Sequence, residues 1–153
     1  LFIIYFLKGD IMNNEIATVN SNASQIRDIF TSTKTIAIIG CSPNPIKASN
    51  AVADFLQNHG YRIVPVYPKE ETILGQKVYR SLEEIPFKVD MVDIFRKPKE
   101  IALIVQSAIK RGDIDTIWTQ LDLVNNEACE EALKAGMNVV QDKCTKIEYS
   151  KYC

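Results

Sequence analysis

Residues 35–49 read Thr35-Ile-Ala-Ile-Ile-Gly40-Cys-Ser-Pro-Asn-Pro-Ile-Lys-Ala-Ser49, and this stretch decides the fold. Its first part is short, apolar and β-branched, which is typical of a strand buried in a parallel sheet. Gly40 ends the strand, and small polar residues then lead into a helix predicted over 49–58. That helix ends at His59-Gly60, where glycine is the usual residue. A strand, a tight loop and a helix in this order indicate a parallel α/β sheet.

The rest of the chain repeats this alternation. Further strands are predicted at 62–66, 91–95, 114–120 and 137–141, and helices at 24–30, 98–110 and 125–133, with a helical turn at 81–85. Five strands separated by helices imply a three-layer α/β domain, with a parallel sheet between two layers of helices. We assign this domain to residues 23–153 and treat residues 1–22 as an N-terminal extension.

The N-terminal extension begins with an apolar segment, Leu1 to Leu7. It is too short for a signal peptide or for a membrane span, which needs about 20 residues. Lys8-Gly9-Asp10 back-translates to a bacterial ribosome-binding sequence just upstream of Met12. We therefore expect translation to start at Met12 and residues 1–11 to be absent from the natural protein. The alternative is a genuine apolar extension that packs on the domain.

Composition excludes several classes of function. The chain has 153 residues, of which 46% are hydrophobic, and its formal net charge is −1. Nucleic acid is therefore not expected as a partner, because phosphate-dominated binding needs a basic face. The four cysteines form no CxxC pair, and His59 is the only histidine, so no zinc set is predicted. Free thiols without a convincing secretory signal indicate a cytoplasmic protein, and no membrane association is expected.

Ligands of parallel α/β sheets bind beyond the carboxyl ends of the strands. The loop after the first strand leads into a helix N-terminus, where backbone N–H groups favour an anion such as pyrophosphate. Ser42, Asn44 and Ser49 add polar donors there, and Lys47 adds charge. The dinucleotide motif GxGxxG and the P-loop motif are both missing. An ordinary strand-to-helix loop with capping residues explains this loop equally well.

The other strand ends add cations. An NAD enzyme usually has an acidic residue after the second strand, but this chain has Lys69, which suits a phosphate near the ribose, as in NADP or coenzyme A. Tyr67 and Pro68 offer a flat surface for adenine. Arg96, after the third strand, can hold a phosphate through two hydrogen bonds. The four cations predicted at this edge are Lys47, Lys69, Arg96 and Lys143.

Several stretches also carry a family resemblance: 35–69, 73–86, 89–98, 117–121 and 139–149. In these stretches the chain resembles the small stand-alone CoA-binding proteins, whose domain is similar to the N-terminal domain of the succinyl-CoA synthetase alpha subunit. The resemblance implies a Rossmann-like fold that binds coenzyme A. It implies ligand contacts for Gly40, Ser42, Asn44, Pro45, Lys47 and Ser49, for Val66, Pro68 and Lys69, for Phe95 and Arg96, and for Gln120.

Two residues depart from the family pattern. Tyr67 stands where asparagine is frequent, which we expect to alter the contacts with adenine. Thr145 stands where proline is frequent, which we expect only to loosen a turn.

Three functions fit these residues. We favour a non-catalytic protein that binds coenzyme A or an acyl-CoA. An NADP-dependent oxidoreductase is favoured by Lys69 but opposed by the missing glycines and by the lack of room for a substrate domain. A subunit of a CoA ligase is the third, although relatives of that kind use a phosphohistidine in a further domain, and His59 is predicted away from the strand ends.

Two further residues carry groups that could take part in chemistry. Cys41 lies beside a helix N-terminus, which favours a thiolate, but we prefer to interpret it as a small residue in a tight loop. Asp93 is interpreted as a structural hydrogen-bonding group rather than as a base.

Overall fold

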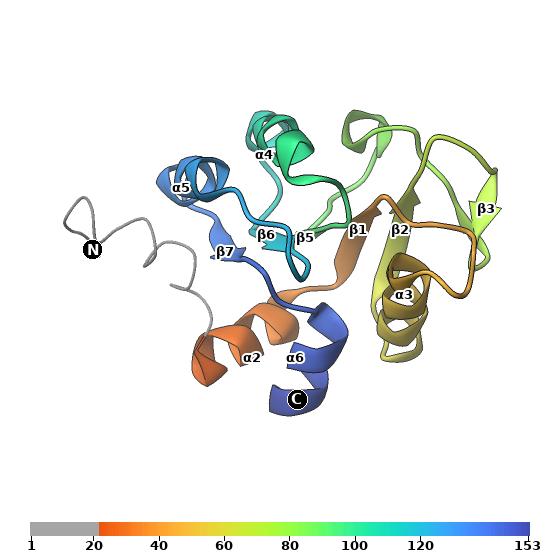
Figure 1. Ribbon diagram of the computed structural model, residues 1–153, viewed down its shortest axis with the longest axis horizontal. Coiled ribbons are helices and arrows are strands. Elements are labelled where there is room, and N and C mark those ends of the chain that lie inside the picture. Colours follow the sequence, from red (N-terminus) through yellow and green to blue (C-terminus); the bar gives the residue numbers. More distant parts are fainter. Residues whose placement is uncertain (1–21) are drawn as a thin grey trace.

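The strand predicted at Thr35 lies inside a parallel sheet in the computed structural model, which describes residues 22–153 (Figure 1). The sheet contains five strands in the order β2-β1-β5-β6-β7, and every neighbouring pair is parallel. Its strands are β1 (Thr35–Ile39), β2 (Arg62–Val66), β5 (Met91–Ile94), β6 (Thr116–Thr119) and β7 (Asn138–Val140). The helices are α2 (Ala23–Ser32), α3 (Ala48–Asn58), α4 (Pro98–Arg111), α5 (Asn126–Lys134) and α6 (Thr145–Tyr152). The predicted α/β fold class is thereby confirmed.

Local sequence explains where the helices begin and end. Asn22 caps α2 through a reciprocal capping box with Gln25. Pro98 opens α4, and Gly112 ends it in the left-handed conformation. The side chain of Asn125 caps α5 by accepting from the N–H of Ala128.

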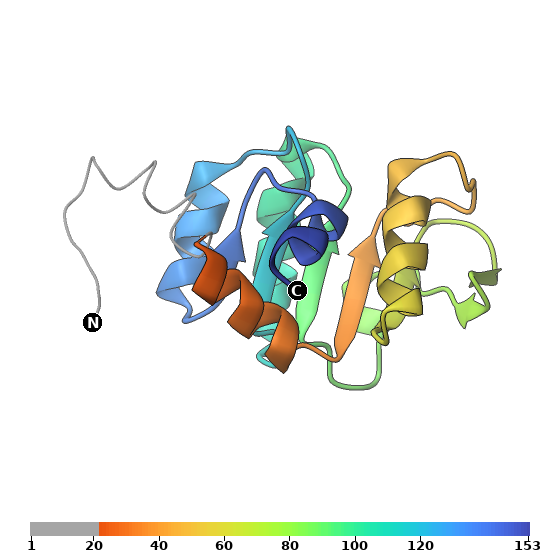
Figure 2. The ribbon, with the colours of Figure 1, turned by 90° about the horizontal axis from the view of Figure 1, so that it is seen from below.

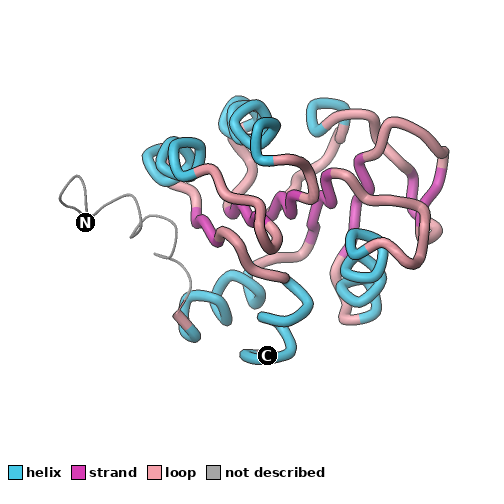
Figure 3. Tube along the Cα trace, viewed as in Figure 1, coloured by secondary structure: helices cyan, strands magenta, loops and turns pink. Residues whose placement is uncertain are grey.

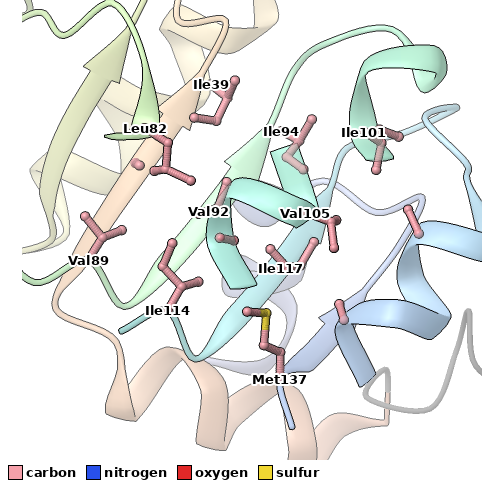
Figure 4. Close-up of a cluster of buried hydrophobic side chains, with 14 of the residues drawn as sticks. Ile39, Leu82, Val89, Val92, Ile94, Ile101, Val105, Ile114, Ile117 and Met137 are labelled. Atoms are coloured by element: carbon pink, nitrogen blue, oxygen red, sulfur yellow. The ribbon is translucent and has the colours of Figure 1, made fainter. Parts of the chain in front are cut away.

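Helices cover both faces of the sheet. Helices α2, α3 and α6 lie on one face, over a core cluster that includes Ile38 and Trp118 (Figure 2). Helices α4 and α5 lie on the other face with the short 3₁₀ helix η1 (Leu82–Glu84), and Figure 4 shows Val92, Val105 and Ile117 packed together in that cluster. No helix within residues 22–153 is long and apolar enough to cross a membrane.

The strand order reverses between β1 and β5. The chain leaves β1 toward β2 through α3 on one face, and it leaves β5 toward β6 through α4 on the other face. The loops that follow β1 and β5 therefore diverge at the carboxyl edge of the sheet (Figure 3). A crevice at such a point is the usual ligand site of an open α/β sheet.

Two features of the fold were not predicted. The long connection after β2 contains a small hairpin, β3 (Thr72–Ile73) and β4 (Gln76–Lys77), around the predicted turn at 74–75. The C-terminal residues form α6, which packs against α2 and α3. The expected start at Met12 lies outside the described residues, as does the segment 1–11.

Candidate functional site

Gly40 ends β1 at the point where three strand ends meet. Its φ is +87°, a conformation that side chains other than glycine rarely adopt. Its N–H donates to the Val66 carbonyl oxygen at 2.9 Å. A Cβ atom here would lie 2.8 Å from the Phe95 carbonyl oxygen and 2.9 Å from Cδ of Arg96. Glycine is therefore required because the ends of β1, β2 and β5 approach within contact distance.

The polar side chains of the loop after β1 bond to the loop itself. Oγ of Ser49 accepts from the N–H of Ser42 at 2.9 Å, and Oγ of Ser42 accepts from the N–H of Asn44 at 3.0 Å. Oδ1 of Asn44 accepts from the N–H of Ile46 at 3.0 Å. The prediction that this loop presents free N–H groups is therefore wrong for these positions. Within the described residues, the N–H groups of Ala48 and Ser49 keep no such partner, and both serine hydroxyls retain a proton to donate.

A cleft of about 300 Å³ opens beside Gly40. One wall is α4, which contributes residues 100, 103, 104 and 107 at the spacing of a single helix face. The opposite wall comes from 66–68 and 80–83. Of the predicted ligand residues, Gly40, Val66, Pro68 and Arg96 line this cleft. Outside its lining lie Ser42, Asn44, Pro45, Lys47, Ser49, Lys69, Phe95 and Gln120.

Arg96 and Glu100 form an ion pair in the cleft. Nε and Nη2 of Arg96 donate to Oε1 of Glu100 at 3.0 and 2.7 Å. Hydrogen bonding from Arg96 lowers the pKa of Glu100, and the arginine charge lowers it further. Burial has a small opposite effect. Glu100 is therefore ionised at neutral pH, and an anionic ligand that approaches Arg96 competes with it for the guanidinium.

Sequence reasoning missed several residues of the cleft. Arg80 donates from Nη1 to the carbonyl oxygens of Tyr67 and Lys69 at 3.0 and 2.9 Å, and so holds the loop after β2. Oγ of Ser107 donates to Oε2 of Glu83 at 2.6 Å. The helical spacing from Arg96 predicts that Glu100 and Ser107 share its face. Arg80 and Glu83 come from the irregular connection after β2, where no pattern points to them.

Gln120 lies at the same edge, at the end of β6, and is buried. Its Nε2 donates to Oδ1 of Asp93 at 2.6 Å and to Oγ1 of Thr145 at 3.1 Å. The Thr145 hydroxyl in turn donates to Oδ2 of Asp93 at 2.9 Å. The expectation that Thr145 only loosens a turn is therefore wrong, because it opens α6 and completes a buried network around Asp93.

Neither Cys41 nor His59 is placed for chemistry at this edge. Burial, and to a smaller extent the charge of Asp93, raise the pKa of Cys41 to about 12, so its thiol stays protonated at neutral pH. This excludes the thiolate interpretation of Cys41. His59 follows the last residue of α3, as predicted, and its ring stacks on Phe55 at 4.0 Å between centroids. No group of three or more metal-ligating side chains occurs within residues 22–153.

Known proteins resemble this chain in sequence and in fold. The family model described as CoA binding domain matches residues 34–150. The uncharacterized protein YneT of Bacillus subtilis (strain 168) is 32% identical over 131 residues, which cover 86% of this chain and 96% of YneT. A hypothetical protein of Pyrococcus horikoshii OT3 has a solved structure with a TM-score of 0.82 and 40% identity, covering 86% of this chain and 92% of that one.

A larger relative contains a similar region. The ADP-forming acetate–CoA ligase I of Archaeoglobus fulgidus is 29% identical over 125 residues, which cover 72% of this chain but only 18% of the ligase. The chain therefore matches one part of the ligase, whereas YneT and the Pyrococcus horikoshii protein are matched over nearly their whole length. The chain belongs to the CoA binding domain family.

Proposed function

We propose that this protein binds coenzyme A, free or acylated, at the carboxyl edge of β1, β2, β5 and β6, and that it catalyses no reaction itself. The observation that carries the proposal is the cleft beside Gly40 and Arg96, at the reversal of strand order in a member of the CoA binding domain family.

The cleft suits the adenine end of the ligand. Ile39, Val66 and Leu82 give it apolar walls for a flat base, and Pro68 extends this surface toward solvent. Arg96 stands at the strand ends, where it meets the pyrophosphate in competition with Glu100. Lys69 is exposed, and its carbonyl oxygen accepts from Arg80. Its ammonium group would meet the ribose phosphate beside the cleft.

The same edge offers little for catalysis. Cys41 is buried with a raised pKa, Asp93 is covered by Gln120 and Thr145, and His59 lies at the far end of α3. None of these three residues therefore supplies a nucleophile paired with a base. A second candidate, a CoA-binding subunit of a CoA ligase, is favoured by the match to the acetate–CoA ligases. In that case another chain would supply the chemistry.

A panel of ligands tests the class of cofactor. A ligand at a hundred times its Kd stabilises the folded state by about 2.7 kcal/mol, which raises the Tm of a domain of this size by roughly 10 °C. We expect CoA to raise Tm clearly, NADP to raise it weakly and NAD to leave it unchanged. The reason is that NAD lacks a ribose phosphate for Lys69 and would also miss the usual acidic partner of its ribose. Thermal shift at one fixed ligand concentration makes the comparison.

Dephospho-CoA is the control in this panel, because it differs from CoA only in the ribose phosphate. A Tm close to that with CoA would mean that Lys69 does not meet that phosphate. Stronger stabilisation by NADP than by CoA would favour the oxidoreductase and refute the proposal.

Charge removal at two positions tests the placement of the phosphates. We expect Arg96→Ala and Lys69→Ala each to weaken CoA binding about tenfold to a hundredfold, since a hydrogen bond to a charged group contributes roughly 1.5–3 kcal/mol. Stability should change little, because the Arg96–Glu100 pair is partly exposed and such pairs contribute about 0–1 kcal/mol. Calorimetric titration measures the affinities. Lys97→Ala, which removes a neighbouring exposed cation outside the cleft, is the matched control, and unchanged affinity in both test variants would place the site elsewhere.

A further inference from the structure

Asp93 is a fully buried carboxylate in the middle of the sheet. It lies on β5 opposite Ile38 of β1 and Trp118 of β6, and its exposed fraction is 0%. The described residues give it no ion-pair partner, and its oxygens accept only from Gln120 and Thr145. An unpaired buried carboxylate is costly in free energy, which makes a purely space-filling role a poor explanation.

The carboxylate fixes the orientation of the Gln120 amide. A glutamine side chain can present either its NH₂ group or its oxygen in a given direction, but above its pKa of about 7 the Asp93 carboxylate is ionised and only accepts hydrogen bonds. Nε2 of Gln120 must therefore face Oδ1 of Asp93, at 2.6 Å, and this NH₂ group also reaches Oγ1 of Thr145. Oε1 of Gln120 is thereby turned away from Asp93.

That oxygen has no partner of its own. Gln120 is 5% exposed, and Oε1 accepts no hydrogen bond from residues 22–153. No fully buried side-chain nitrogen or oxygen in this part of the chain lacks a partner, so Oε1, which has none, is at least partly open to the surface. A single hydrogen-bond acceptor is thus held rigidly at the end of β6.

The acceptor stands at the same edge as the cleft. The N–H of Gln120 donates to the carbonyl oxygen of Ile94, at the end of β5, and Arg96 lies two residues beyond Ile94. A ligand whose adenine end occupies the cleft would cross the end of β5 with an extended arm and meet Gln120 next. The arm of coenzyme A carries amide N–H groups, which are donors.

We propose, on the basis of the proposed function, that Asp93 is a positioning residue: it fixes the Gln120 amide so that Oε1 accepts a hydrogen bond from an amide N–H of the CoA arm. Asp93 itself touches no ligand. Its role is to remove the alternative orientation, in which the NH₂ group would face that donor.

The test compares coenzyme A with adenosine 3′,5′-bisphosphate, which has the adenine and the ribose phosphate but no arm. Gln120→Met removes the acceptor at similar volume, and Asp93→Asn removes the constraint on the amide. We expect both variants to bind coenzyme A about threefold to tenfold more weakly than the wild type, the size of one neutral hydrogen bond, and to bind the bisphosphate unchanged. The double variant should be no weaker than Gln120→Met alone, because the two residues act through one contact.

Gln141→Met is the matched control, since Gln141 is a buried amide at the next strand end that accepts from the N–H of Asn125 and from Sγ of Cys129 and donates to Asn126. Wild-type affinity of Asp93→Asn for coenzyme A, or an equal loss for both ligands, would overturn the positioning role. If Asp93→Asn does not fold, Gln120→Met still decides, because unchanged binding of coenzyme A removes the contact. A wild type that binds neither ligand refutes the proposed function instead.

Discussion

Replacement of Gly40 by alanine is expected to lower the free energy of unfolding by about 3 kcal/mol. A side chain at a positive φ costs roughly 1–2 kcal/mol, and forcing extra atoms into a packed region costs about 1–3 kcal/mol more. Both apply here, because φ is +87° and the new Cβ would lie 2.8 Å from the backbone oxygen of Phe95. A backbone atom cannot give way as a side-chain tip can, so the ends of β1 and β5 must separate.

Gly136→Ala is the matched control for this prediction. Its φ is +89°, but nothing lies within 4 Å of an added Cβ. Guanidinium unfolding of both variants separates the cost of the backbone conformation from the cost of the close approach. Equal losses in the two variants would show that the contact between the strand ends contributes nothing. A larger loss for Gly40→Ala should be accompanied by weaker CoA binding, since Arg96 packs against the same point.

The strands were predictable because each is a short apolar run, and nearly every residue of each strand is buried in the sheet. The predicted strand 62–66 coincides with β2, and the prediction of 35–40 differs from β1 only by Gly40. Strand β6 is shorter than the predicted 114–120 because Ile114 is buried before the ladder begins and Gln120 turns into the loop. Apolar character marks burial, whereas the ladder depends on a neighbouring strand, so the ends of strands are less well defined by sequence.

Helix α6 escaped prediction for a related reason. Its sequence, from Thr145 to Tyr152, has no apolar stripe. Tyr149 instead packs edge-on against Phe30 of α2 and Phe55 of α3, and Thr145 bonds to Asp93 in the sheet. The helix is therefore stabilised by contacts with distant elements, which a local pattern does not reveal.

The candidate site also contains residues that the sequence predicts and residues that it does not. Gly40 directly follows β1 and Arg96 lies two residues beyond β5, and the carboxyl ends of parallel strands meet at one edge, so the sequence predicts both at the edge where the cleft opens. Arg80 and Glu83 form a wall of the cleft, but they come from a connection without hydrophobic periodicity. No sequence pattern therefore predicts that they lie beside Gly40 and Arg96. The internal bonds of Ser42, Asn44 and Ser49 were also hidden, because the same hydroxyl and amide groups suit a ligand and a tight loop equally well.

Stability is expected to fall as pH rises from 5 to 8, because of Asp93. Burial raises the pKa of this carboxyl group from 3.8 to about 7, against the hydrogen bonds from Gln120 and Thr145, which lower it. The folded state therefore holds a proton that the unfolded chain has already released, and the free energy of unfolding falls by about 1.4 kcal/mol per pH unit between these two values. The stabilisation is complete below the unfolded pKa and is lost as pH rises through about 7.

Urea unfolding at pH 5 and pH 8 measures this effect, and the wild type should lose about 3 kcal/mol between them. Asp93→Asn has no such proton to release, so its stability should change far less over the same range. Asp54→Asn, which alters an exposed carboxylate of α3, should retain the wild-type dependence. The range from pH 5 to pH 8 lies above the titration of Asp90. Burial acts to raise the pKa of Asp90, but the N–H groups of Thr35 and Lys34 lower it overall, so its effect on stability occurs at more acid pH. Parallel behaviour of the wild type and Asp93→Asn would mean that Asp93 is ionised throughout, with Gln120 and Thr145 compensating for its burial.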